Sequence, residues 1–271
     1  MKNRVFKTDK LPYLELRYIS QIRSCDKKHQ HSELTITAIE AGEIEIHFER
    51  KIDLLKPKQV SIVNPKEVHS ATLTDIKSFG CYVLYLEKNW CEYIQQSLFE
   101  TKNYKKIDKS LIKNSNIYSN FVNICNALFD RNSSFLEKEE RLIEFISSLF
   151  LSNNLQREDR NKNPKNSKIA FEIQNYLESN IENEILLKDI AKHLNLSIVH
   201  ILRIFKQEFN LPIHSYLLDR KVHIAKELLS KNIPIAEVAQ MSGFFDQSHL
   251  NRFFKRVFQL TPSEYQKNLF S

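Results

Sequence analysis

The same helical pattern occurs twice near the C-terminus, and this duplication constrains the fold more than any other feature of the sequence. In each copy, apolar residues three and four apart predict a short helix, a turn and a second, longer helix. The first copy covers residues 187–209, with Ser197 as the cap of its second helix, and the second covers residues 235–258, with Asp246 in the same role. Such a unit is a helix-turn-helix, so the sequence predicts two of them.

The longer helix of the second copy is strongly two-sided. One side is an apolar stripe made of Leu250, Phe253, Phe254, Val257 and Phe258. The other side is polar and carries Gln247, Ser248, Asn251, Arg252 and Lys255. Gln and Asn can pair with adenine, Arg with guanine and Lys with phosphate. A solvated surface is the simpler interpretation of one such helix, but the repeat favours DNA recognition.

The first copy has the same two-sided character. Its inward residues are predicted to be Ile201, Leu202, Phe205 and Phe209. Its outward residues are predicted to be Val199, His200, Arg203 and Lys206. Between the copies, residues 213–230 predict one helix of about 27 Å, which could hold two reading helices roughly one DNA turn (34 Å) apart. A capping box at residues 261–264 predicts a final helix.

The N-terminal part has a different pattern. Residues 1–86 predict short strands at 34–39, 43–49, 60–63 and 81–86, with a turn around Ala41-Gly42, as in a sandwich or small barrel. Residues 87–151 predict helices at 87–99, 109–130 and 136–151. Residues 152–167 are polar and predict a linker, and residues 168–271 form the helical domain with the duplicated motif.

Composition permits a nucleic-acid partner without establishing one. The net charge is +7, and neither half of the chain is strongly polarised. Three glycines leave little room for a phosphate-binding loop, and no nucleophile motif or carboxylate pair indicates an enzyme. No apolar run approaches the ~18 residues of a membrane helix, and the start of the chain lacks the apolar core of a signal peptide. Four scattered cysteines without CxxC favour a reducing, cytoplasmic location.

A specific series of residues follows the first copy. It consists of Arg220-Lys221-Val222, Ala225, Leu228-Leu229, Ile235-Ala236-Glu237-Val238-Ala239, Gly243-Phe244, Gln247-Ser248-His249-Leu250, Arg252-Phe253-Phe254-Lys255 and Thr261-Pro262. In order and spacing, this part of the chain resembles the AraC/XylS family of bacterial transcription regulators. The resemblance implies a sequence-specific DNA-binding regulator that is no enzyme, with RNA polymerase as a further partner and no membrane partner.

The resemblance also implies which residues read bases. In the first copy they are Val199 and Arg203, and in the second they are Gln247, Ser248, His249, Asn251 and Arg252. Asn210 and Gln259 stand where the family usually has Gly after a helix; Asn tolerates the left-handed conformation better than Gln does. Leu202 replaces a residue that is polar in relatives, and we expect it either in the core or against a thymine methyl.

The front of the chain resembles the sensor half of the same family, through His29-Gln30-His31, Gly42, Pro57 and residues 64–69. The fold class implied is α+β: an N-terminal cupin-type β-barrel with a helical layer, then an all-α domain with two helix-turn-helix motifs. The resemblance implies a small-molecule effector in the barrel, and it suggests a homodimer through residues 108–151. Two-fold symmetry would match paired DNA half-sites.

The barrel histidines leave alternatives open. His29, His31 and His69 match the imidazole positions at which enzymatic cupins hold a metal, but Glu33 comes too early to supply the expected carboxylate. We therefore predict no metal or other cofactor, and we expect these histidines to contact the effector or to form hydrogen bonds in the barrel mouth. A metal-dependent cupin enzyme with an appended helical domain is the alternative. A third hypothesis is a constitutive DNA-binding protein whose barrel is only a docking surface.

Overall fold

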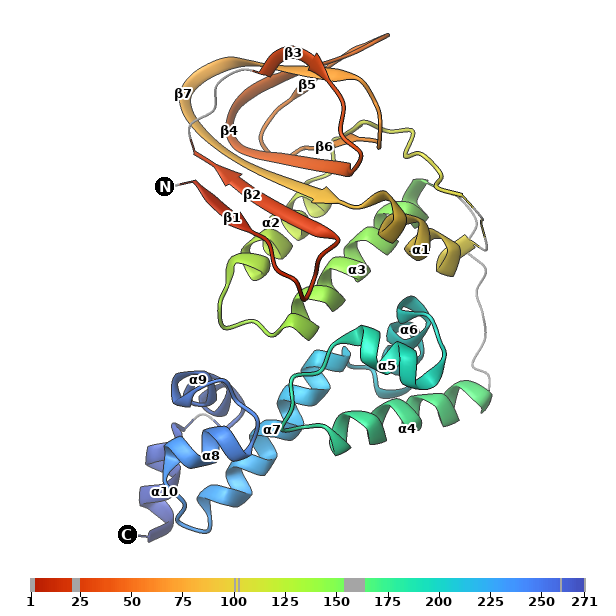
Figure 1. Ribbon diagram of the computed structural model, residues 1–271. Coiled ribbons are helices and arrows are strands. Elements are labelled where there is room, and N and C mark those ends of the chain that lie inside the picture. The colour runs from red at the N-terminus through yellow and green to blue at the C-terminus, as the bar shows by residue number, and fades with distance from the viewer. Residues whose placement is uncertain are drawn as a thin grey trace. The chain divides into compact units, whose positions relative to one another are not determined.

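The computed structural model describes residues 3–20, 25–99, 101, 103–153, 164–258 and 260–270 (Figure 1). The chain divides into two compact units. Unit 1 comprises Met1–Ser133 and Arg141–Glu158, and unit 2 comprises Ser134–Glu140 and Asp159–Ser271. The sequence predicts residues 134–140 as part of the helical layer, whereas in the structure they belong with the C-terminal unit. No helix in the described ranges is long and apolar enough to cross a membrane.

Unit 1 is built on one antiparallel sheet. Its strands are β1 (Arg4–Phe6), β2 (Leu14–Ile19), β3 (Cys25–His29), β4 (Leu34–Phe48), β5 (Ile52–Leu55), β6 (Val60–Val63), β7 (His69–Leu86) and β8 (Leu111–Ile112). The hydrogen-bonded order is β1-β2-β7-β4-β6-β8, with β3 on β7 and β5 on β4. The long strands β4 and β7 pair with each other and curl (Figure 1). The cupin-like fold is therefore present as a curled sheet, and the order of its described strands does not close on itself.

The predicted turn at Ala41-Gly42 is wrong. The chain continues there as a single strand of 15 residues, and both of its halves pair with β7. The pairing register shifts between Ile39 and Ile44, and Gly42 adopts a φ of 84°. A glycine with positive φ allows a bulge that bends a strand without reversing it. The alternation predicted for the second half is confirmed, since Ile44 and Ile46 are buried in the core.

Three helices follow the sheet: α1 (Lys88–Phe99), α2 (Ser115–Phe129) and α3 (Phe135–Asn153). The predicted helix at residues 109–130 begins later than expected, because Leu111–Ile112 form β8 against β6. Asn114 then caps α2, and its side chain accepts hydrogen bonds from the amides of Asn116 (2.9 Å) and Ile117 (3.2 Å). Buried thiols at Cys81, Cys91 and Cys125 are free.

Unit 2 is helical. Besides the first residues of α3, it contains α4 (Pro164–Ser179), α5 (Leu187–Leu194), α6 (Ile198–Phe209), α7 (Ile213–Leu229), α8 (Ile235–Met241), α9 (Gln247–Phe258) and α10 (Pro262–Phe270). Most of the predicted linker, residues 154–163, lies outside the described residues. The ends of the predicted linker are helical, because α3 reaches Asn153 and α4 begins at Pro164.

The helix starts predicted from local sequence are confirmed. The Ser197 hydroxyl accepts a hydrogen bond from the His200 amide at 3.3 Å, and the Asp246 carboxylate accepts one from the His249 amide at 2.6 Å. Thr261 and Glu264 form a reciprocal capping box, with the Thr261 amide donating to Glu264 at 2.7 Å and the Glu264 amide donating to the Thr261 hydroxyl at 3.2 Å.

Candidate DNA interface and effector site

The first helix-turn-helix is formed by α5 and α6. Asn195 ends α5 in the left-handed conformation (φ 52°), and Asn210 ends α6 in the same way (φ 54°), so Asn replaces Gly there as expected. Ile201 and Phe205 are fully buried, and Leu202 is 7% exposed. Leu202 therefore belongs to the core, and only the opposite face of α6 is accessible to solvent.

The opposite face of α6 carries the predicted DNA-contacting residues. Val199, His200 and Arg203 are partly exposed, and Lys206 is exposed. The Arg203 guanidinium donates a hydrogen bond to His200 Nδ1 at 2.9 Å. This bond joins two predicted contact residues one helical turn apart, so they present a common polar edge to the solvent.

The second helix-turn-helix is formed by α8 and α9, and Gly243 lies at its turn. Its φ of 72° favours glycine, and a Cβ atom there would lie 2.5 Å from the carbonyl oxygen of Ile181. The Lys221 ammonium donates to the Gly243 carbonyl at 2.7 Å, and burial lowers the pKa of Lys221 to about 8. Lys221 of α7 thus holds the turn, and the chain after α4 passes too close to it for a side chain at position 243.

The apolar side of α9 packs into a core shared with α7, α8 and α10. Leu250 and Phe254 are fully buried, and Phe253 and Phe258 pack against the same cluster. Val257 was predicted to belong to this stripe, but it is 42% exposed. The stripe is narrower than the sequence suggests because position 257 lies at the edge of the face that the core covers.

Four of the predicted contact residues on α9 are exposed: Gln247, Ser248, Arg252 and Lys255. Asn251 is partly exposed. His249 differs from them, because its ring packs edge-on against Phe244 (5.3 Å between ring centroids) and Phe253 (5.0 Å). Burial, followed by the charge of Arg252, lowers the pKa of His249. His249 is thus partly exposed, but its ring also packs against Phe244 and Phe253 at the start of α9.

One exposed residue near α9 was missed in the sequence. Phe245 directly precedes the cap Asp246, and its side chain is 83% exposed. The signal was available, since Phe245 is a large aromatic residue in a turn, outside the apolar stripe of α9.

The long helix α7 connects the two motifs. It has 17 residues, which corresponds to about 26 Å at the α-helical rise. The prediction of one uninterrupted helix between the motifs is confirmed. Its residues Val222, Ala225 and Leu229 lie in the core of the second motif, so α7 is part of that motif's fold as well as a spacer.

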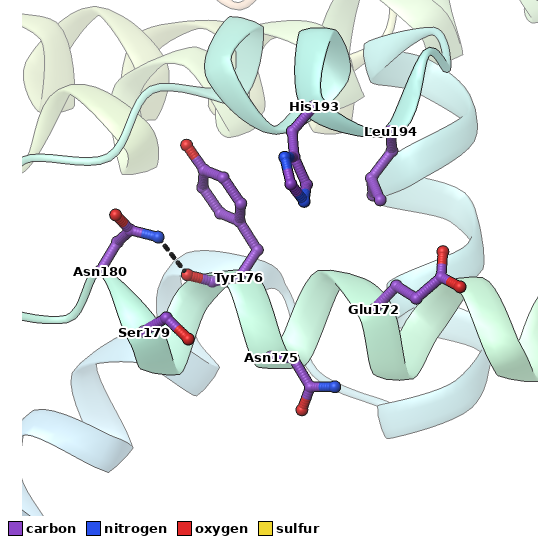
Figure 2. A pocket seen from close by; sticks show the side chains of 7 residues that line it. All are labelled: Glu172, Asn175, Tyr176, Ser179, Asn180, His193 and Leu194. Atoms are coloured by element: carbon purple, nitrogen blue, oxygen red, sulfur yellow. Dashed lines mark hydrogen bonds between the residues drawn. The ribbon is translucent and has the colours of Figure 1, made fainter.

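A surface pocket of about 600 Å³ lies between α4 and α5 (Figure 2). It is lined by Glu172, Asn175, Tyr176, Ser179, Asn180, His193 and Leu194. The rings of Tyr176 and His193 lie next to each other in its lining, with centroids 5.0 Å apart and planes tilted by 44°. None of the predicted DNA-contacting residues lines this pocket.

In unit 1 the sheet brings the three predicted effector-site histidines together. His29, the last residue of β3, pairs directly with His69, the first residue of β7. The ring of His31 lies 4.8 Å from that of His29 and 5.2 Å from that of His69, and the His29 and His69 rings are 4.4 Å apart. His69 is 6% exposed, and the other two are partly exposed.

A smaller pocket of about 220 Å³ adjoins His31. It is lined by Lys7, Pro12, Tyr13, Leu14, Glu15, Arg17, His31, Glu33, Tyr85 and Glu87. The Arg17 guanidinium lies over the Tyr85 ring at 4.8 Å, and the His31 ring lies 5.4 Å from the same ring. The lining is rich in charged and polar groups, which suits a small polar ligand.

Two family models match the chain. The model described as "AraC-like ligand binding domain" matches residues 15–146, and the model described as "Helix-turn-helix domain" matches residues 190–268. Together they cover the sheet with its helices and both helix-turn-helix motifs.

Two known proteins and one solved structure show similarity to the chain. The chain is 33% identical over 95 residues to the multiple antibiotic resistance protein MarA of Escherichia coli (strain K12), covering 35% of this chain and 75% of MarA. It is 24% identical over 196 residues to the probable transcriptional regulator LumQ of Photobacterium leiognathi, covering 72% of this chain and 66% of LumQ. A structure of apo ToxT from Vibrio cholerae aligns over 95% of this chain and 98% of ToxT, with 16% identity and a TM-score of 0.41. The chain therefore belongs to the AraC/XylS family, as a DNA-binding transcription regulator with an N-terminal ligand-binding domain.

Proposed function

We propose that the exposed faces of α6 and α9 bind successive major grooves of double-stranded DNA, and that a small molecule bound in unit 1 controls this binding. The observation that carries the proposal is the division of α9. Leu250 and Phe254 are fully buried on one side, whereas Arg252 and Lys255 are exposed on the other. A helix anchored in this way can enter a groove without disturbing its own core.

The contact residues divide by chemistry. Arg252, Gln247 and Asn251 on α9 and Arg203 on α6 carry groups that can pair with base edges, so we assign them to sequence readout. Lys255 and Lys206 are exposed cations, and we assign them to phosphate. Ser248 and His200 suit either partner, and the Val199 side chain suits a thymine methyl. The exposed ring of Phe245 precedes the same helix and is assigned an apolar contact with the DNA sugar or base.

The packing of His249 supports a different role from that of its neighbours. Its ring lies against Phe244, which follows the turn, and against Phe253 on α9. We therefore assign His249 to positioning the start of α9, with any DNA contact made by the exposed residues around it.

The effector site is assigned to His29, His31 and His69 with the adjoining pocket that contains Arg17 and Tyr85. A ligand there regulates transcription only if it has different affinities for the DNA-binding and the inactive states of the protein. We propose that this preference changes either DNA binding or contact with RNA polymerase.

The remaining assignments follow from the regulatory role. A homodimer through residues 108–151 would match two-fold-related half-sites on DNA. Because its DNA partner is chromosomal, we propose that the protein acts in the cytoplasm. Regulation by a bound ligand requires no catalytic step, so we propose no enzymatic activity.

The test is selection of DNA from a random-sequence pool by the full chain, followed by fluorescence anisotropy with the selected duplex and a scrambled one. We expect the selected duplex to bind at least about 10³-fold more tightly at physiological salt. Equal affinity for both duplexes would refute sequence-specific binding. A thermal-shift screen of small metabolites on the same protein tests the effector role, because a ligand that binds the folded state raises the melting temperature.

A further inference from the structure

The three histidines of unit 1 converge on a common point. One nitrogen from each of His29, His31 and His69 lies within 4.8 Å of the corresponding nitrogens of the other two. Three points so placed have a common centre no more than about 2.8 Å from each, and a bound metal ion needs about 2.0–2.1 Å to an imidazole nitrogen. Shifts of less than about 1 Å in each ring therefore suffice for coordination.

Backbone pairing holds the cluster together. His29 and His69 are direct partners across β3 and β7, and the Lys66 amide donates a hydrogen bond to the His31 carbonyl at 2.6 Å. The second bond ties the segment after β3 to the turn before β7. Because the three residues are joined through main-chain hydrogen bonds, the convergence of their rings does not depend on the side chains alone.

Two of the rings are oriented by the backbone in a way that suits coordination. His29 Nδ1 lies 3.0 Å from the Lys27 carbonyl oxygen, and His69 Nδ1 lies 3.0 Å from the Glu67 carbonyl oxygen. A carbonyl oxygen can only accept, so Nδ1 carries the proton in both rings. In the neutral form of either ring, the lone pair is therefore on Nε2. Histidines that bind metals are typically oriented by such a bond from the other ring nitrogen.

We propose that His29, His31 and His69 bind one divalent transition-metal ion through three imidazole nitrogens. Uncharged nitrogen donors suit zinc, nickel, cobalt, copper or ferrous iron, whereas magnesium and calcium prefer oxygen. Three protein ligands leave a coordination position for water or for an acidic group of a ligand. The proposal rests on the proposed function in that it names the ligand class of the effector site, and it departs from the sequence-based expectation that this site holds no metal.

The experiment uses the full chain, freed of metal with a chelator and titrated with Zn²⁺ by calorimetry and with Co²⁺ by visible absorption. We expect the calorimetric titration to give one Zn²⁺ ion per chain. We expect the visible spectrum to show the absorption bands of Co²⁺ coordinated by nitrogen. Loss of a supporting hydrogen bond typically weakens metal binding about 10- to 100-fold, so His29→Ala and His31→Ala, which remove ligands, should weaken it further. His31 is partly exposed, so its replacement disturbs the core less than replacement of the buried His69 would, and circular dichroism checks that the variant is folded.

The matched control is His47→Ala. His47 lies in β4 of the same sheet, where its Nε2 is 3.3 Å from the Glu45 carboxylate, outside the cluster. The His47→Ala protein should bind Zn²⁺ with the same affinity and stoichiometry as the wild type. Equal Zn²⁺ affinity in wild type and in folded His31→Ala protein would overturn the proposal, as would the absence of stoichiometric binding.

DNA binding by the same samples separates the two proposals. If the protein binds the selected duplex but does not bind Zn²⁺ stoichiometrically, the metal site is refuted and the proposed function still holds. Stoichiometric Zn²⁺ without sequence-specific DNA binding would support the metal site and contradict the proposed function.

Discussion

Glu140 caps the helix that begins at Ile213: one oxygen of its carboxylate accepts a hydrogen bond from the Ile213 amide at 2.9 Å, across 73 residues of sequence. The other oxygen accepts from the His214 amide (3.0 Å) and from His214 Nδ1 (2.8 Å). Glu140 is 2% exposed. The neighbouring Glu139 accepts from the Leu187 amide at 3.2 Å, at the start of α5. Neither α5 nor α7 has a side-chain cap from its own N-cap residue, so α3 supplies both.

Replacing Glu140 by Ala should destabilise unit 2. The substitution leaves the buried Ile213 amide and the partly buried His214 amide without their acceptor, and the expected loss in free energy of unfolding is about 1–3 kcal/mol. Urea denaturation measures it. Glu227→Ala, at an exposed position on α7, is the control and should change stability by less than about 0.5 kcal/mol. Equal effects from both substitutions would contradict the capping role.

Arg252→Ala should relax sequence preference. If the guanidinium pairs with a base, its loss costs about 1–3 kcal/mol at the selected duplex and much less at scrambled DNA. Anisotropy titrations with both duplexes at one salt concentration test this. Unchanged binding to both would remove Arg252 from base readout.

Lys255→Ala should weaken binding to all DNA sequences by a similar factor. A lost phosphate contact also reduces the slope of log affinity against log salt by about 1. The check is a salt series on selected and scrambled duplexes. A loss confined to one base position would show instead that Lys255 reads sequence.

Lys221 should make the stability of unit 2 depend on alkaline pH. Burial lowers its pKa in the folded protein to about 8, from an ordinary value of 10.5. Between these values the unfolded chain holds a proton that the folded protein has released, so the free energy of unfolding rises with pH. Relative to Lys221→Met, the wild type should gain at most about 3 kcal/mol from pH 8 to 10.5, and nothing further below pH 8. Relative to Lys231→Met, a change at an exposed site that keeps Lys221, the stability of the wild type should not change over this pH range, as denaturation midpoints would show.

Much of unit 2 could be predicted from the sequence because its signals are local. A cap such as Ser197 or Asp246 acts on an amide three residues away, and the apolar spacing of α9 repeats within one or two helical turns. The interactions that define these helices therefore lie within short windows of the chain, where spacing alone reveals them. The assignment of the contact residues to DNA remains a prediction.

The parts that could not be predicted depend on residues far apart in the sequence. Gly42 looks like a turn, but pairing of both flanking segments with β7 makes it a bulge. Positions 139 and 140 look like ordinary acidic positions on a helix surface, and only packing in unit 2 turns them into caps for α5 and α7.

The histidine cluster of unit 1 also depends partly on sequence and partly on tertiary structure. The sequence determines which nitrogen donors are available, through the histidines themselves and the His-x-His spacing of His29 and His31. The register of β3 against β7 decides that His69, 40 residues further on, lies directly beside His29. Local spacing determines which secondary structures form, whereas the positions of distant side chains are set by strand register and by the burial of the core, which involve the whole chain at once.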